Sequence, residues 1–227
     1  MYGGDFCRIR AHVATSNASG ITLEAWFPSN WTGRFLATGN GGVGGCIQYE
    51  DIAYGNFFGF ATVASNNGHD GMTGKPFLHA PDIIEDFAWR AVYTETIVGK
   101  ELTNQFYKKN FTKAYYLGCS TGGRQGMKMA QAYPDLFSGI VAGAPAWDFN
   151  NLDSWGGYLG MQTGFDNTSS SFVPINLWAV VHEEILKQCD GLDGAIDGYA
   201  TRVSPKFQAH HFYQNYRRSR SLPASLQ

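Results

Sequence analysis

Long apolar segments are missing from this sequence. No hydrophobic run approaches the roughly 20 residues that are needed to cross a membrane, and the first residues contain no apolar stretch typical of a signal peptide. An excess of one charge is also missing, because 17 Lys and Arg residues face 19 Asp and Glu residues and leave a net charge of −2. The sequence therefore predicts neither a membrane association nor a nucleic-acid partner.

Cysteine is scarce, and its residues are widely separated. The four cysteines are Cys7, Cys46, Cys119 and Cys189. This spacing favours disulfides over a clustered metal site. Cys7 and Cys46 flank the first expected strands and are predicted to pair, which would add about 3–4 kcal/mol on the chain-entropy estimate. A buried free thiol is the alternative for each.

Four N-x-[ST] sequons give a second sign of the secretory pathway. They begin at Asn17, Asn30, Asn110 and Asn167. Because these signs occur without a signal peptide, we predict a secreted, glycosylated protein whose true N-terminus precedes Met1.

The residues that are present suit a globular α/β protein. Hydrophobic residues make up 44% of the 227 positions, enough for a sizeable core. Apolar segments typical of strands lie at residues 21–27, 34–38, 60–65, 114–117 and 139–145. Segments with helical spacing lie at residues 81–107, 123–133 and 174–186. Strands that alternate with helices predict a mainly parallel sheet with helices on its faces.

The most informative segment is the G-x-S-x-G pentapeptide centred on Ser120. A strand is expected before it and a helix after it, which is the setting of the nucleophile elbow of an α/β-hydrolase. Glycines flank the serine because a Cβ on either side would clash in such a sharp turn. Ser120 is therefore the predicted nucleophile of an α/β-hydrolase core.

An oxyanion hole needs two N–H donors. Thr121, directly after the nucleophile, is expected to supply one, and Gly41 or Gly42 the other, because glycine lets the backbone approach a substrate. Residues 40–42 are also typical of a simple hairpin turn. They do not form a phosphate loop, because no Lys-Ser or Lys-Thr follows the glycines.

The composition changes after Trp147, and residues 150–172 are rich in Gly, Asn and Ser. We predict a core at residues 1–149, the start of a lid insertion at 150–205 and an unpatterned tail at 206–227. Residues 189–199 carry three aspartates and three glycines, a spacing that can wrap oxygens around Ca²⁺. A solvated Asp-Gly turn is the alternative. Four aromatic residues in or near this region are expected either to line a pocket for the acyl group or to pack within the lid. They are Trp147, Trp155, Tyr158 and Phe165.

Four segments resemble the fungal tannase/feruloyl esterase family. They are YLGCSTGGRQG at 116–126, GIVAGAP at 139–145, GNGG at 39–42 and SNNGHD at 65–70. The resemblance spans residues 7–203 and implies a secreted serine esterase that acts on esters of phenolic acids. It also implies a structural calcium ion in the lid. Its ligands would be the side chains of Asp190, Asp193 and Asp197 and the main-chain oxygens of Ala195 and Tyr199.

The catalytic Asp and His of that family lie downstream of its lid, and this chain shows no counterpart of either. None of His12, His69, His79 or His182 sits where the family places its base, and His210-His211 lack the adjacent cysteine. Side chains adjacent in a loop rarely face each other, so His69-Asp70 is expected to be structural. By the same resemblance Cys119 and Cys189 would pair with cysteines beyond Gln227.

A serine without a base is a poor nucleophile. We therefore predict an α/β-hydrolase incomplete at its C-terminal side and inactive alone. The intact protein would hydrolyse feruloyl or galloyl esters. A catalytically inactive secreted domain that binds phenolic or polysaccharide ligands is the first alternative. Another GxSxG acyltransferase or peptidase is the second.

Overall fold

The computed structural model describes residues 4–200. The chain divides into two compact units, Met1–Leu152 and Asp153–Gln227. The first holds the predicted nucleophile, and the second holds the aspartate-rich loop. The expected tail at 206–227 lies outside the described residues, and the assignment of residues 150–205 to a lid stays a prediction.

A six-stranded sheet forms the centre of the first unit, in the order β1-β2-β4-β3-β5-β6. The strands are β1 (Phe6–Ala14), β2 (Gly20–Pro28), β3 (Arg34–Thr38), β4 (Phe60–Ser65), β5 (Lys113–Cys119) and β6 (Gly139–Gly143). Strands β4, β3, β5 and β6 run parallel, whereas β1 and β2 are antiparallel additions at one edge. The carboxyl ends of four parallel strands therefore meet at the same edge, where α/β enzymes place their ligands.

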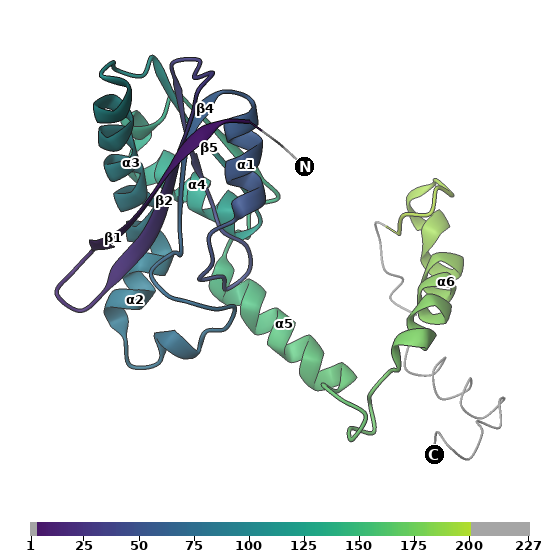
Figure 1. Ribbon diagram of the computed structural model, residues 1–227. Helices are drawn as coiled ribbons and strands as arrows, with labels where there is room; N and C mark the ends of the chain where they lie inside the picture. The colour runs from purple at the N-terminus through teal and green to yellow at the C-terminus, as the bar shows by residue number, and fades with distance from the viewer. Residues whose placement is uncertain (1–3, 201–227) are drawn as a thin grey trace. The chain divides into compact units, whose positions relative to one another are not determined.

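Helices cover both faces of this sheet, as Figure 1 shows for α1 and α3. Helix α1 (Tyr49–Phe57) packs on one face against Leu36 and Thr62. Helix α3 (Ala91–Tyr107) packs on the other against Phe35 and Val63, the adjacent positions of the same two strands. Helix α4 (Thr121–Ala132) packs on β5 and β6, and the ring of Tyr133 after it meets that of Tyr93 on α3 at 4.5 Å. The alternation of strand side chains thus builds two layers of core.

The long helix expected at residues 81–107 forms, with one irregular turn. It consists of α2 (Pro81–Glu85), a π-helical turn (Asp86–Arg90) and α3. Such a turn lets backbone carbonyls take partners outside the helix. Here the Arg124 guanidinium donates to the carbonyls of Phe87 and Ala88, both at 3.1 Å, so this turn is tied to the helix that follows Ser120.

Three regular elements go beyond the sequence predictions, and the first of them is helix α1. Strand β1 adds a sixth strand to the five expected, paired along its length with β2. Helix α5 (Phe149–Thr163) occupies much of the Gly-, Asn- and Ser-rich segment after the sheet. A 3₁₀ turn (Ile175–Leu177) then leads into α6 (Trp178–Cys189), and a second such turn covers Asp190–Asp193.

The predicted Cys7–Cys46 disulfide is wrong, because both thiols are unpaired. Cys7 on β1 pairs with Phe27 on β2, and Ser65 on β4 pairs with Leu23 on β2. Phe27 and Leu23 are four residues apart on β2. At about 3.3 Å per residue, this offset is about 13 Å along the strand. The carbonyls of Cys46 and Ser65 lie together, since the Asn40 amide donates to both, at 3.0 and 2.8 Å. A disulfide requires Cα atoms within about 7 Å, so Cys7 lies too far down the sheet.

Candidate active site

Ser120 stands in a strained turn between β5 and α4. Its φ of 60° and ψ of −116° are rare for a residue with a side chain. Its N–H donates to the Gly143 carbonyl at 3.0 Å, and its carbonyl accepts from the Ala146 N–H at 2.9 Å. The segment after β6 thus locks the backbone, while the side chain is exposed and its hydroxyl makes no hydrogen bond with the described residues. This is the geometry of a nucleophile elbow, as the pentapeptide predicts.

The flanking glycines are needed because the elbow packs directly against neighbouring backbone. A Cβ on Gly118 would lie 2.7 Å from the carbonyl carbon of Gly122. A Cβ on Gly39, after β3, would lie 2.6 Å from the Gly122 Cα. Both separations are shorter than real side-chain contacts, so any larger residue would force the turn apart. The structure therefore places residues 39–45, the glycine-rich segment after β3, directly against the elbow.

The predicted oxyanion donors come together from segments far apart in the sequence. The Thr121 hydroxyl donates to the Gly42 carbonyl at 2.6 Å, and Gly42 has a φ of +60° that favours glycine. The N–H groups of Thr121, Gly41 and Gly42 donate to no acceptor within residues 4–200. That these N–H groups point at a substrate oxygen stays a prediction. All three lack an acceptor among the described residues, and Thr121 and Gly42 are in direct contact.

A buried amide network, absent from the sequence predictions, holds the same segment. The Gln125 side chain accepts from the Asn40 N–H at 3.0 Å and donates to the side-chain oxygens of Asn40 and Asn67, at 3.1 and 3.0 Å. Gln125 and Asn67 are 0% exposed and Asn40 is 3% exposed. Its signals were asparagines two residues beyond the ends of β3 and β4, and a glutamine one helical turn after Thr121.

His69 is part of this framework. Its ring is 5% exposed and its Nε2 lies 2.8 Å from the Val43 carbonyl, in the glycine-rich segment. Asp70 accepts instead from the Asn66 amide at 3.0 Å, so the adjacent pair is not a catalytic dyad. The structural role expected for His69-Asp70 fits these contacts. Within residues 4–200 no histidine is hydrogen-bonded to the Ser120 hydroxyl.

One buried acid lies on the face of the sheet that α3 covers. Glu95 on α3 is 0% exposed, and neither of its carboxyl oxygens has a hydrogen-bond partner among the described residues. Burial raises the pKa of Glu95 well above its usual range, because the charged form loses its hydration inside the protein. The pKa of the buried Tyr116 phenol is raised in the same way, by burial first and then by Glu95.

The aspartate-rich loop is folded on itself in the second unit. Asp190 accepts from the N–H groups of Asp197 and Gly198 at 3.3 and 3.1 Å, and Asp193 accepts from the Ala195 N–H at 3.0 Å. These oxygen donors suit a hard cation by type. Within residues 4–200, however, no three His, Cys, Asp or Glu side chains are grouped closely enough to hold a metal ion. The calcium assignment, including Ala195 and Tyr199, stays a prediction.

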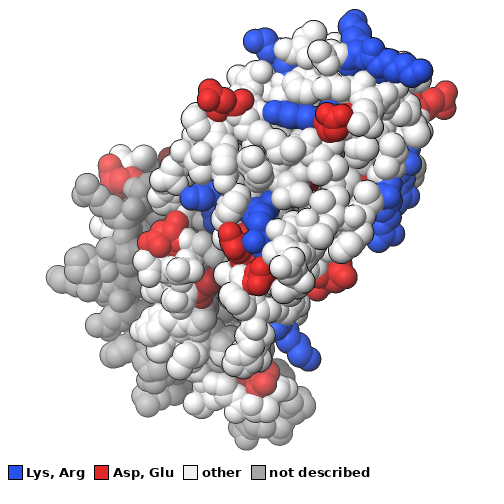
Figure 2. Space-filling view, turned by 90° about the vertical axis from the view of Figure 1, so that its left-hand side faces the viewer, with Lys and Arg blue, Asp and Glu red and all other residues white. Residues whose placement is uncertain are grey.

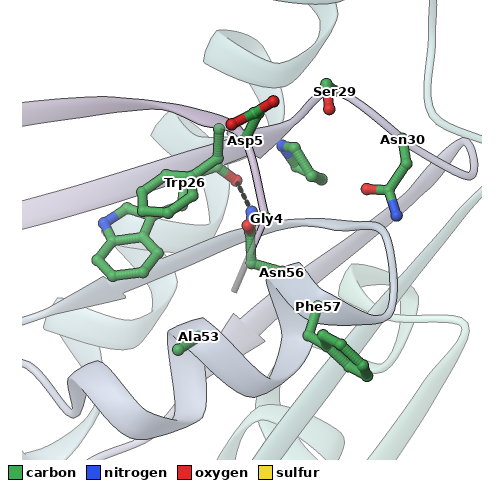
Figure 3. A pocket seen from close by; sticks show the side chains of 10 residues that line it. Gly4, Asp5, Trp26, Ser29, Asn30, Ala53, Asn56 and Phe57 are labelled. Atoms are coloured by element: carbon green, nitrogen blue, oxygen red, sulfur yellow. Dashed lines mark hydrogen bonds between the residues drawn. The ribbon is translucent and has the colours of Figure 1, made fainter. Parts of the chain in front are cut away.

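The hollow in Figure 3 lies away from Ser120, at the opposite edge of the sheet. It opens between the start of β1, the end of β2 and helix α1. The Asn56 amide on its floor donates to the Trp26 carbonyl at 3.3 Å. Because the parallel strands point their carboxyl ends the other way, this hollow is not the site of the predicted chemistry.

The surface carries charges of both signs. On the face in Figure 2, acidic and basic side chains are scattered over a largely uncharged surface. No helix of the described part is long and apolar enough to cross a membrane.

Comparisons with known proteins give the chain a family context. A model of the family "Tannase and feruloyl esterase" matches residues 7–215. A probable feruloyl esterase B of Aspergillus clavatus is 59% identical over 86% of this chain, and feruloyl esterase C of Talaromyces stipitatus is 55% identical over 92%. The chain spans 37% and 39% of the length of these two relatives.

Solved structures agree with the fold. Feruloyl esterase B from Aspergillus oryzae superposes with a TM-score of 0.78 and 55% identity, over 87% of this chain and 39% of that one. Tannin acyl hydrolase from Aspergillus niger superposes with a TM-score of 0.68 at 24% identity, over 87% of this chain and 38% of that one, a likeness of fold alone. The α/β-hydrolase core and its mainly parallel sheet are therefore confirmed.

Proposed function

The chain belongs to the tannase and feruloyl esterase family, and from this premise we propose that it carries the nucleophile and the oxyanion donors of a serine esterase for phenolic esters. The observation that carries the proposal is the strained Ser120 turn, locked to Gly143 and Ala146 and packed against the free N–H groups of the glycine-rich segment. Strain of this kind persists only where the surrounding structure enforces it.

The reaction would follow the acyl-enzyme scheme. The Ser120 oxygen attacks the ester carbonyl carbon and its proton passes to a base, a histidine by family resemblance. The N–H of Thr121 and that of Gly41 or Gly42 hold the negative oxygen of the tetrahedral intermediate. Collapse expels the alcohol, and water then releases the phenolic acid by the same steps. Removing one such donor typically costs about 10²–10³ in kcat.

Exposed apolar side chains beside the elbow support an aromatic acyl group as the ligand. Met72 touches the glycine-rich segment, its Cε being 3.8 Å from where a Gly42 Cβ would stand, and it is 59% exposed. Trp147 follows the segment that locks Ser120 and is 63% exposed. Large apolar residues left in solvent at such a place suit a substrate ring.

Secretion and calcium binding belong to the same proposal. All four sequon asparagines are exposed, which N-glycosylation requires. The aspartate-rich loop would hold Ca²⁺ through Asp190, Asp193 and Asp197 and the carbonyls of Ala195 and Tyr199 if its carboxylates turned inward. The ion would brace the lid without taking part in the chemistry.

The test is hydrolysis of methyl ferulate and methyl gallate by a protein of the relatives' length that contains this chain. We expect turnover that Ser120→Ala abolishes, and a covalent adduct on Ser120 after treatment with a phosphonate ester. Tight binding of ferulate without turnover or adduct would instead favour a non-catalytic phenolic-binding domain. Transfer of the acyl group to an alcohol in preference to water would favour an acyltransferase.

A further inference from the structure

Two side chains on α4 hold the glycine-rich segment at two points. Thr121 binds the carbonyl of Gly42 through its hydroxyl, at 2.6 Å. Gln125, one helical turn later, binds the N–H and the side chain of Asn40, at 3.0 and 3.1 Å. Because residues four apart share one face of a helix, both contacts come from the same side of α4.

From this geometry we propose that Thr121 and Gln125 form a two-point clamp that positions the oxyanion donors against the nucleophile. The clamp rests on the proposed esterase function and extends it to two positioning side chains. The segment from Asn40 to Gly42 contains the candidate donors Gly41 and Gly42, and the clamp grips it at both ends. The third donor, the Thr121 N–H, belongs to the clamping helix itself, so all the donors share one rigid support.

Burial makes this arrangement stiff. Thr121 is 1% exposed and Gln125 0%, so both clamping side chains are shielded from solvent. Gln125 also donates to the Asn67 side chain at 3.0 Å, which links the end of β4 to the same clamp. The next part of the segment is held separately, by His69 on the Val43 carbonyl and by the Gly45 N–H on Gly71. The clamp is therefore the direct connection of residues 40–42 to α4.

An oxyanion hole works through preorganisation, since donors that are already in place need no rearrangement when charge develops. Loosening the clamp should leave substrate binding largely intact and slow the chemical step. It should also free the backbone of residues 40–44. The first effect depends on the esterase function, whereas the second does not.

The experiment measures amide hydrogen exchange in peptides covering residues 39–46 of the 227-residue chain. Thr121→Val is nearly isosteric but lacks the hydroxyl, whereas Thr121→Ser keeps it. Gln125→Met lacks both amide groups, and Gln131→Met changes an exposed glutamine on the same helix. We expect about tenfold faster exchange in Thr121→Val and Gln125→Met, because each loses a hydrogen bond that holds the segment. Exchange in Thr121→Ser and Gln131→Met should change by no more than about twofold.

Kinetics on a protein of the relatives' length supply the second readout. Thr121→Val and Gln125→Met should lower kcat on methyl ferulate about 10- to 100-fold with KM within about threefold. Thr121→Ser should restore most of kcat. If Gln125→Met does not fold by circular dichroism, Gln125→Glu replaces it, because it keeps the acceptor for Asn40 and loses the donors.

The two proposals fail in different ways. Unchanged exchange in Thr121→Val and in the Gln125 variant overturns the clamp, whatever the activity. The clamp is also overturned if the Thr121→Val and Gln125 variants change kcat and KM by no more than Gln131→Met does. A wild-type protein that does not hydrolyse aromatic esters overturns the esterase function, while the exchange measurement still decides the clamp.

Discussion

At the scale of single residues, Ser120 shows how backbone strain is kept in place. A positive φ in a residue with a side chain costs about 1–3 kcal/mol. Two backbone hydrogen bonds, to Gly143 and from Ala146, oppose any relaxation of the turn. Close packing of Gly39 on Gly122 leaves the elbow no room to flatten. The strain at one residue is therefore maintained by contacts from two segments, residues 143–146 and the residues after β3.

The buried acid Glu95 gives a prediction at the same scale. Its pKa is raised in the folded state, so between about pH 4.3, its unfolded value, and that raised pKa only the unfolded state is ionised. The unfolded state then holds fewer protons, and the free energy of unfolding falls as pH rises, by up to about 1.4 kcal/mol per pH unit. Glu95→Gln should remove this slope and make the variant relatively more stable at pH 7 than at pH 4.

Urea unfolding at pH 4, 5.5 and 7 measures the effect. Glu101→Gln, an exposed site on the same helix, is the matched control and should follow the wild type. Equal pH dependence of Glu95→Gln and wild type would show that Glu95 ionises in the folded protein.

At the scale of elements, α4 is coupled to the π-helical turn through Arg124. The guanidinium donates to the carbonyls of Phe87 and Ala88 and lies 4.8 Å from the Phe87 ring centre and 5.1 Å from that of Phe149. Arg124→Met should lower the free energy of unfolding by about 2–4 kcal/mol, because it leaves two carbonyls without these donors. Arg124→Lys should not restore it, since one ammonium does not reproduce the planar fork.

Thermal and urea unfolding would measure this loss. Lys128→Met, one turn further along α4, is the control and should change stability by less than about 0.5 kcal/mol. If Lys128→Met lowers the free energy of unfolding as much as Arg124→Met does, the effect of Arg124 comes from its positive charge and not from its hydrogen bonds to the two carbonyls.

The aspartate-rich loop supports a second prediction at this scale. If it binds Ca²⁺, free calcium at 100 times its dissociation constant adds about 2.7 kcal/mol of stability. The melting temperature should therefore rise in millimolar calcium, and Asp193→Ala should abolish the rise. Asp166→Ala, at an exposed turn of the same unit, should leave the rise intact. A melt unmoved by calcium in the wild type would remove the metal assignment.

The element scale also shows what sequence patterns can predict. Strands β3 and β4 form at the residues expected, because their apolar runs end in clear turn signals. Strand β1 carried an ordinary alternating pattern, with Ile9, Ala11 and Val13 between polar residues, and could have been predicted. Helix α5 was harder, because its glycines and asparagines oppose helix formation locally.

At the scale of the whole molecule, the local geometry of the candidate site was predictable and its long-range contacts were not. The pentapeptide predicts the strained turn at Ser120, because an elbow is built from neighbouring residues. The catalytic roles of Ser120 and Thr121 stay predictions. The contacts of Gln125 with Asn40 and Asn67 join residues 85 and 58 positions apart. Such pairings depend on which strands lie side by side, which no local pattern specifies. The Cys7–Cys46 prediction failed for the same reason, because spacing in the sequence does not show where two residues lie along the direction of the strands.

The last prediction concerns the activity of the 227-residue polypeptide itself. Attack by Ser120 needs a proton acceptor within hydrogen-bond reach. His69 is buried on the Val43 carbonyl, and no other histidine within residues 4–200 is hydrogen-bonded to Ser120. The 227-residue polypeptide should therefore hydrolyse methyl ferulate no faster than its Ser120→Ala variant, whereas a protein of the relatives' length should be active and should lose that activity on the same substitution. Initial rates of all four proteins, compared at equal concentration, decide it. Turnover by the short polypeptide that Ser120→Ala abolishes would mean that one of its own histidines is the base, and His69→Gln and His210→Gln would then identify which.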